Sequence, residues 1–138
     1  MANHYHPVFG RHIRVEHWQN AMRQGANAAR NMLKHGLPYD EIPWFWSDQY
    51  DAHIQYAGYH TAYDALIVRG RLDHASYAAF YMSGGVITAV VGFNNAKDVR
   101  RAMPLIKTRR PVDPARLRDE GVDLRSLMND AQTKRISV

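Results

Sequence analysis

The stretch SYAAFYMSGGVITAVVGF, residues 76–93, decides the fold of this chain. It contains two runs rich in Val, Ile, Tyr and Phe on either side of Ser83-Gly84-Gly85. β-Branched and aromatic residues favour strands, and glycines supply the positive φ angles of a tight hairpin turn. The stretch therefore predicts two antiparallel strands joined by a short turn.

Similar runs precede this hairpin, and turn residues separate them. This pattern predicts a meander of short antiparallel strands, with the runs at His53–Tyr59, Asp64–Arg69, Ser76–Met82 and Val86–Phe93. The segment Arg11–Glu16 alternates polar and apolar residues, as a short strand would. We expect a sheet of four to five strands.

A helix is predicted to begin at Trp18, because apolar and small residues recur there with the spacing of one helix face. They occupy positions 18, 21, 22, 25, 28, 29, 32 and 33. The helix should end near Gly36, because glycine can take the left-handed conformation and Pro38 prevents continuation. The middle of the stripe is small, so we expect another element to approach the helix backbone closely.

The C-terminal half is predicted to be helical. Asn94-Asn95 offers an N-cap for a helix whose apolar face carries Val99, Ala102, Met103 and Ile106. Pro104 should kink this helix or break it in two. A second helix is expected over residues 122–131, followed by a fraying tail over 132–138. The fold class is thus α+β, an antiparallel sheet with C-terminal helices on one face, preceded by a long helix.

Composition bounds the function classes. The chain has 138 residues, 46% of them hydrophobic, which is typical of one compact domain. No apolar run approaches the roughly 20 residues that cross a bilayer, and the N-terminus does not resemble a signal peptide. We therefore expect a cytoplasmic protein that does not enter membranes. The absence of cysteine excludes disulfides, thiolate zinc sites and iron–sulfur clusters within the chain.

The net charge of +5 indicates an acidic partner, which could be nucleic acid, an anionic membrane or an acidic protein. No nucleic-acid recognition motif accompanies the charge, so we do not expect nucleic acid. Acidic residues such as Asp98 and Asp119 interrupt the basic C-terminal half. A solvated helix face of mixed charge therefore stays open as an alternative.

Several familiar catalytic patterns are missing. The chain contains no GxGxxG, GxxxxGK[ST] or GxSxG motif. Among its eight histidines, His4 and His6 alternate near the N-terminus, but no pair has helical metal-ligand spacing, so we expect no metal site. Asp48 and Asp51 are interpreted as turn residues rather than a catalytic carboxylate pair. No catalytic residue is predicted.

The segment PWFWSDQYD, residues 43–51, has two tryptophans one residue apart and no helical spacing, and is interpreted as an aromatic loop. Together with RVEHWQNAMRQG, residues 14–25, it closely resembles the C-terminal region of NADH-dependent, FAD-containing ferredoxin reductases. That family includes putidaredoxin reductase and the reductases of aromatic-ring dioxygenase systems, with apoptosis-inducing factor as a more distant relative. The likeness continues through residues 78–113, so it covers nearly the whole chain.

The resemblance implies that residues 1–36 are the terminal strand and helix of an FAD-binding domain and that 37–138 form the C-terminal interface domain. It also implies cofactor contacts at the start of the helix and on the tryptophan segment, namely Glu16, His17, Trp18 and Trp46. Trp44 is interpreted as a core anchor. The glycine-rich fingerprints of the FAD and NADH domains do not occur here, so FAD should be absent or weakly bound.

Two functions follow as hypotheses. The first is an oxidoreductase portion that covers the flavin and docks an acidic iron–sulfur ferredoxin, which is inactive without the FAD and NADH domains. Its basic residues would steer the ferredoxin; these are Lys97, Arg100, Arg101, Lys107, Arg109 and Arg110. The second is a non-catalytic module that associates with a second copy of itself through the apolar helix face.

Overall fold

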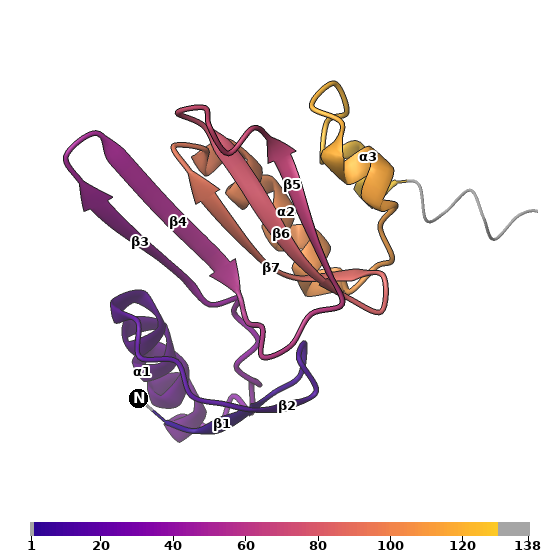
Figure 1. Cartoon of the computed structure of the whole chain (residues 1–138). Coiled ribbons are helices and arrows are strands. Elements are labelled where there is room, and N and C mark those ends of the chain that lie inside the picture. Colours follow the sequence, from indigo (N-terminus) through magenta and orange to yellow (C-terminus); the bar gives the residue numbers. More distant parts are fainter. Residues whose placement is uncertain (1, 130–138) are drawn as a thin grey trace, which may run out of the picture.

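A five-stranded antiparallel sheet forms the centre of the molecule (Figure 1). The computed structural model describes residues 2–129. The strand order is β3-β4-β7-β6-β5, and the bounds are β3 Trp44–Gln49, β4 Ala52–Gly58, β5 Ala65–Gly70, β6 Tyr77–Ser83 and β7 Val86–Phe93. The predicted α+β class and number of strands are therefore confirmed.

The hairpin of β6 and β7 has the predicted tight turn. Ser83 pairs with Val86, so Gly84 and Gly85 form a two-residue turn, with φ angles of 58° and 77°. Both angles lie in the left-handed region that glycine adopts without steric cost. The buried residues of this hairpin form much of the core, which includes Ala78, Phe80, Met82, Ile87 and Val90.

The predicted simple meander is wrong in its order. β4 pairs with β7, whereas β5 lies at the far edge beside β6. The chain leaves β4 at Gly58, whose φ is +101°, and crosses to the other edge, where the backbone N–H of Asp64 donates to the Met82 carbonyl. Only long-range hydrogen bonds distinguish this order from a meander, because both orders use the same local patterns.

The predicted aromatic loop is also wrong, because residues 44–49 form edge strand β3. Trp44 pairs with Ala57, and the register continues to Gln49 opposite Ala52. The strand lies at the sheet edge and its residues are half-buried or exposed on both faces. It therefore lacks the alternation of buried and exposed residues that would reveal a strand.

Helix α2, Ala96–Thr108, packs on one face of the sheet against β7 and β4. As predicted, Asn95 caps it, its side-chain oxygen accepting from the Asp98 backbone N–H at 3.1 Å. Pro104 lies inside the helix but does not break it. Buried residues on both sides of Pro104, Ala102 and Leu105, hold the two halves against the same core.

The rest of the C-terminal half differs from the expected second helix. A short helix, α3, covers Pro114–Arg118 beside β5, and a 3-10 turn, η1, covers Ser126–Met128. The helix expected over 122–131 does not form within the part that the structure describes. The predicted tail at 132–138 lies outside the described residues.

The N-terminal elements lie together beside the end of the sheet where β3 begins (Figure 1). Strands β1, His4–His6, and β2, Arg11–Ile13, form a two-stranded ribbon, and α1 covers Trp18–Met32. The strand expected over 11–16 is thus shorter and belongs to a separate ribbon.

Behind Trp18, the apolar stripe of α1 is exposed within residues 2–129. Met22 and Met32 are 50% and 84% exposed, and nothing lies within 4 Å of a Cβ built on Gly25. The close neighbour predicted for the small residues is therefore not part of the described chain.

His6 joins the N-terminal ribbon to the linker that precedes β3. Its side chain is fully buried, and Nε2 donates to the Glu41 carbonyl at 3.0 Å. Nδ1 is shielded from solvent and has no hydrogen-bond partner. The ring packs against Phe9 and lies near His4 and Tyr39.

Stability should fall on acidification because of this histidine. Burial lowers the pKa of His6 below 6.5. The hydrogen bond to Glu41 and the charge of Asp40 raise this pKa, whereas His4 and Lys107 lower it further. The unfolded chain then binds the proton more tightly, so stability is full above pH 6.5 and is lost as the pH falls below it.

We expect His6→Phe to reduce this loss by up to about 1.4 kcal/mol per pH unit, the value for one proton. Urea unfolding at pH 7.5, 6.5 and 5.5 measures it, and His74→Gln, in an exposed turn, is the control. An unchanged pH slope in His6→Phe would contradict the assignment.

Candidate functional site

Two tryptophans form an aromatic wall on β3. Trp44 and Trp46 lie two residues apart, so they occupy the same face of the strand. Their rings stack with centroids 5.0 Å apart. Trp46 is 46% exposed, whereas the Nε1 atom of Trp44 is buried and has no hydrogen-bond partner. Trp46 is thus the member of the pair that offers an open indole surface.

The N-terminus of α1 lies beside this wall. His17 takes the N-cap position in an extended conformation, but its side chain does not cap the helix. Its ring packs on Phe45 instead, with centroids 4.4 Å apart. Trp18, the first helical residue, is 70% exposed. Packing between strand and helix therefore brings two sequence-distant aromatic pairs together.

An aromatic cavity of about 410 Å³ lies between these elements. Its lining is mainly apolar and comprises His17, Trp18, Gln19, Trp44, Phe45 and Trp46. Three of the four predicted site residues, His17, Trp18 and Trp46, thus line one cavity. The proximity follows from tertiary packing, since 28 residues separate Trp18 from Trp46 in the sequence.

Glu16, the fourth predicted residue, does not line the aromatic cavity. It faces a neighbouring polar cavity of about 490 Å³, lined by Arg14, Val15, Glu16, His17, Tyr56, Gly58, Tyr59 and His60. Glu16 pairs there with Arg14 at 3.0 Å, and both side chains are largely exposed. His17 lines both cavities.

The polar cavity contains a tyrosine–histidine pair that the sequence did not reveal. The Tyr56 hydroxyl lies 2.8 Å from Nδ1 of His60. Burial raises the pKa of Tyr56 and lowers the pKa of His60, so both groups are neutral at pH 7. The His60 ring stacks on Tyr81 at 4.0 Å. Only the spacing of four residues in YAGYH hinted at this pair.

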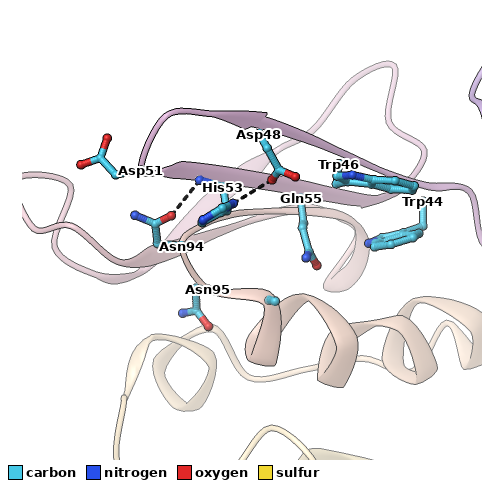
Figure 2. A pocket seen from close by; sticks show the side chains of 9 residues that line it. Trp44, Trp46, Asp48, Asp51, His53, Gln55, Asn94 and Asn95 are labelled. Carbon is cyan, nitrogen blue, oxygen red and sulfur yellow. Dashed lines mark hydrogen bonds and ion pairs between the residues drawn. The ribbon is translucent and has the colours of Figure 1, made fainter.

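A third cavity, of about 530 Å³, lies between the tryptophan wall and the start of α2 (Figure 2). Asp48 Oδ1 lies 2.8 Å from His53 Nδ1, and the Asn94 side chain accepts from the His53 backbone N–H at 2.8 Å. Asp51 points away from Asp48 in Figure 2. The two aspartates therefore do not form a carboxylate pair, although Asp48 lies on a strand rather than in the expected turn.

The basic residues of the C-terminal half separate into two groups. Lys97, Arg100 and Arg101 line a groove of about 400 Å³ with Pro104, Arg125 and Met128. Arg101 also pairs with Asp123 at 3.2 Å, and the adjacent positive charges and the Arg125 N–H lower the pKa of that carboxyl. Arg125 was not among the predicted steering residues, because its place beside α2 depends on the 3-10 turn.

Other basic residues serve local structure. Lys107 pairs with Asp40 at 3.1 Å, and Arg110 donates to the Met128 carbonyl. Arg109 occupies the left-handed C-cap of α2 with φ 50°. Of the six predicted steering residues, Lys97, Arg100 and Arg101 therefore line the groove. The other three, Lys107, Arg109 and Arg110, do not line it.

The aromatic cavity suits one edge of a flat, conjugated ring system. Indole and phenyl faces offer stacking surface, and the buried, unpartnered Nδ1 of His17 offers a polar contact. The N-terminus of α1 adds free backbone N–H groups and a positive dipole end. The chain contains no glycine-rich phosphate cradle, so these residues fit one wall of a flavin site and not its phosphates.

Neither a membrane helix nor a metal cluster emerges from residues 2–129. In that part, no helix combines the length and hydropathy needed to cross a bilayer. Likewise, these residues form no group of three or more His, Cys, Asp or Glu arranged for a metal ion.

Comparisons with known proteins agree on one family. The family model described as reductase C-terminal matches residues 44–128. The ferredoxin–NAD(+) reductase component of the anthranilate 1,2-dioxygenase system of Burkholderia cepacia is 38% identical over 91% of this chain and 31% of its own length. Putidaredoxin reductase of Pseudomonas putida is 34% identical over 96% of this chain and 32% of its own length.

A solved structure supports the fold. The crystal structure of the covalent putidaredoxin reductase–putidaredoxin complex aligns with a TM-score of 0.85 and 31% identity, over 93% of this chain and 31% of that chain. The chain therefore spans about a third of the length of the relatives that it matches.

Proposed function

The chain belongs to the reductase C-terminal family, and on that premise we propose that it supplies the flavin-covering wall and the ferredoxin-docking surface of an NAD(P)H:ferredoxin oxidoreductase. One observation carries the proposal: Trp44 and Trp46 line both the aromatic cavity and the cavity at the start of α2, the helix whose basic residues line the groove. The absence of cysteine supports a cytoplasmic location. By itself the chain would not oxidise NADH.

FAD is the cofactor that the aromatic cavity would contact. When bound, it would accept a hydride from the nicotinamide and release electrons singly. Trp46 and Trp18 would exclude water from the ring, and the free N–H groups at the start of α1 would stabilise negative charge on its edge. Glu16 would lie in the polar cavity without touching the FAD ring, whereas His17 would contact the ring.

The exposed stripe of α1 supports the proposed division at residue 36. Trp18 is 70% exposed, and the stripe behind it is exposed within residues 2–129, although apolar patches of this kind are usually covered. We assign residues 1–36 to the FAD-binding domain and 37–138 to the interface domain. The covering surface would then belong to the FAD-binding domain.

The basic groove would receive the ferredoxin. Four cationic side chains line it together with Pro104 and Met128, so the groove offers apolar contact beside positive charge. Such a surface complements an acidic protein and raises the rate of encounter. The relative solved in complex with putidaredoxin supports a ferredoxin as the partner.

We expect Arg100→Glu to weaken binding of oxidised putidaredoxin to the chain about tenfold at low ionic strength, because it reverses a charge at the groove. Arg23→Glu, on exposed α1, makes the same change in net charge and should alter the affinity less than twofold. Isothermal titration calorimetry at two salt concentrations measures both. Equal losses in the two variants would show that net charge, and not the groove, governs binding.

The second candidate is a self-associating module, which the same exposed α1 stripe favours. Two copies could bury the stripe against each other without any flavin domain. Sedimentation of the chain at high concentration decides between the candidates, since a monomer excludes self-association and a dimer that Met22→Glu dissociates supports it.

A further inference from the structure

His17 separates two cavities of different character. Among the described residues, it is the one that the aromatic cavity and the polar cavity share. On one side lie the rings of Trp18 and Trp46, and on the other the polar groups of Glu16 and His60. The imidazole of His17 therefore faces both cavities.

The imidazole is held in place without using its hydrogen bonds. Its ring packs on Phe45 at 4.4 Å, and Nδ1 is buried and has no partner. Although His17 is the N-cap residue, its side chain accepts no hydrogen bond from a helix N–H. The side chain is therefore positioned by packing, and its ring nitrogens stay available for a proton.

The polar cavity offers a route to solvent. Its titratable groups face the same cavity as His17 and come from three segments: Arg14 and Glu16 from its own segment, Tyr56 from β4, and Tyr59 and His60 from the residues that follow β4. The Glu16 side chain is 61% exposed, so a proton that reaches this cavity reaches water.

We propose that His17 carries a proton out of the aromatic cavity to the polar cavity during electron transfer, an inference that rests on the proposed function. The balance requires the release of one proton. NADH gives up a hydride, which is one proton and two electrons, and two oxidised ferredoxins take one electron each. One proton is therefore left in the aromatic cavity for each NADH oxidised.

The electrostatics of the site support this role. Burial lowers the pKa of His17, so the imidazole is neutral at pH 7 and can accept a proton. A histidine can take a proton on one nitrogen and release one from the other, and general acid–base transfer of this kind is worth about 10²–10⁴ in rate. The neutral Tyr56–His60 pair adds no fixed charge that would block the exit.

The main test uses a reductase in which this chain replaces the C-terminal third of putidaredoxin reductase. The protein is loaded with FAD and mixed with NADH and putidaredoxin in a stopped-flow instrument, with a pH indicator in weak buffer. Proton release and flavin absorbance are recorded together. The variants are His17→Gln, which keeps hydrogen bonding without titrating, and His74→Gln as the matched control.

We expect His17→Gln to slow proton release at least tenfold while flavin bleaching by NADH changes less than twofold. Added imidazole should restore the rate, which a merely structural defect would not allow, and His74→Gln should behave as the parent. Parental proton release in His17→Gln overturns the relay and leaves the proposed function standing. A folded fusion that retains FAD but never bleaches overturns both.

A second measurement needs no fusion. Imidazole ¹⁵N spectra of the isolated chain should show a neutral His17 at pH 7, and riboflavin should shift its resonances but not those of His74. A doubly protonated His17 at pH 7, or resonances that riboflavin leaves in place, overturns the proposal.

Discussion

Arg69→Leu is expected to lower the free energy of unfolding by about 3 to 5 kcal/mol, because it removes one partner of a buried ion pair. Arg69 lies on β5 and is only 5% exposed. Its Nε donates to Asp98 Oδ2 at 3.1 Å, and its terminal nitrogens donate to four carbonyls, those of Leu117, Asp119, Glu120 and Val122. Leucine would leave the buried Asp98 carboxyl without its cationic partner and the four carbonyls without this donor.

The change should also release the segment after α3. The Leu117 carbonyl belongs to α3 and the other three to the chain between α3 and η1, so one guanidinium fastens that segment to the sheet. Since the segment leads to Arg125, the basic groove should lose its shape along with stability. Arg69→Lys should retain part of the stability, because lysine keeps the charge but lacks the planar fork of donors.

Urea unfolding followed by circular dichroism measures the effect. Arg71→Leu is the matched control two residues away, where the ion pair with Asp73 is about two-thirds exposed on both sides. Exposed pairs contribute at most about 1 kcal/mol. A loss in Arg69→Leu no larger than in Arg71→Leu would contradict the assigned role.

Gly58→Ala should cost about 3 kcal/mol or more, because two independent penalties combine at this residue. Its φ of +101° is disfavoured for a residue with a side chain. A Cβ there would lie 2.3 Å from the Thr88 carbonyl oxygen and 2.7 Å from the Ala89 Cα, both backbone atoms of the paired strand β7. Relief requires β4 and β7 to separate, which weakens the centre of the sheet.

Replacing a different glycine by alanine should have the opposite effect on stability. Gly25, in the middle of α1, has open space around its Cβ position, so Gly25→Ala should stabilise the helix by up to about 1 kcal/mol. Thermal and urea unfolding of the two variants compare them directly. Similar stability of both proteins would show that β4 and β7 adjust without cost.

Local signals were sufficient where a structure depends on neighbours in the sequence. The turn at Gly84-Gly85, the start of α1 at Trp18 and the Asn95 cap of α2 formed as predicted. Each depends on residues adjacent in the sequence: glycines that take positive φ, a residue period of one helix face, and an asparagine that accepts from a helix N–H.

The predictions were wrong where contacts between residues distant in the sequence determine the local structure. β3 has no alternation, and its pairing with β4 makes it a strand. Pro104 was expected to kink its helix or break it in two; the break does not occur, because burial of residues on both sides keeps α2 continuous.

The candidate site shows the same division. The family resemblance indicated the four residues from two separate motifs, and the structure placed His17, Trp18 and Trp46 around one cavity while Glu16 faces another. The Tyr56–His60 pair had only its four-residue spacing as a signal, and the place of Arg125 in the groove had none.

By itself, the sequence determined the α+β class, the central hairpin, the two long helices and the family, because these depend on residue periods, turn chemistry and contiguous motifs. Only the tertiary structure decided the strand order, the buried network of Arg69, and the position of His17 between two cavities. These features arise from pairings across tens of residues, where burial and hydrogen bonding between distant segments outweigh local preference.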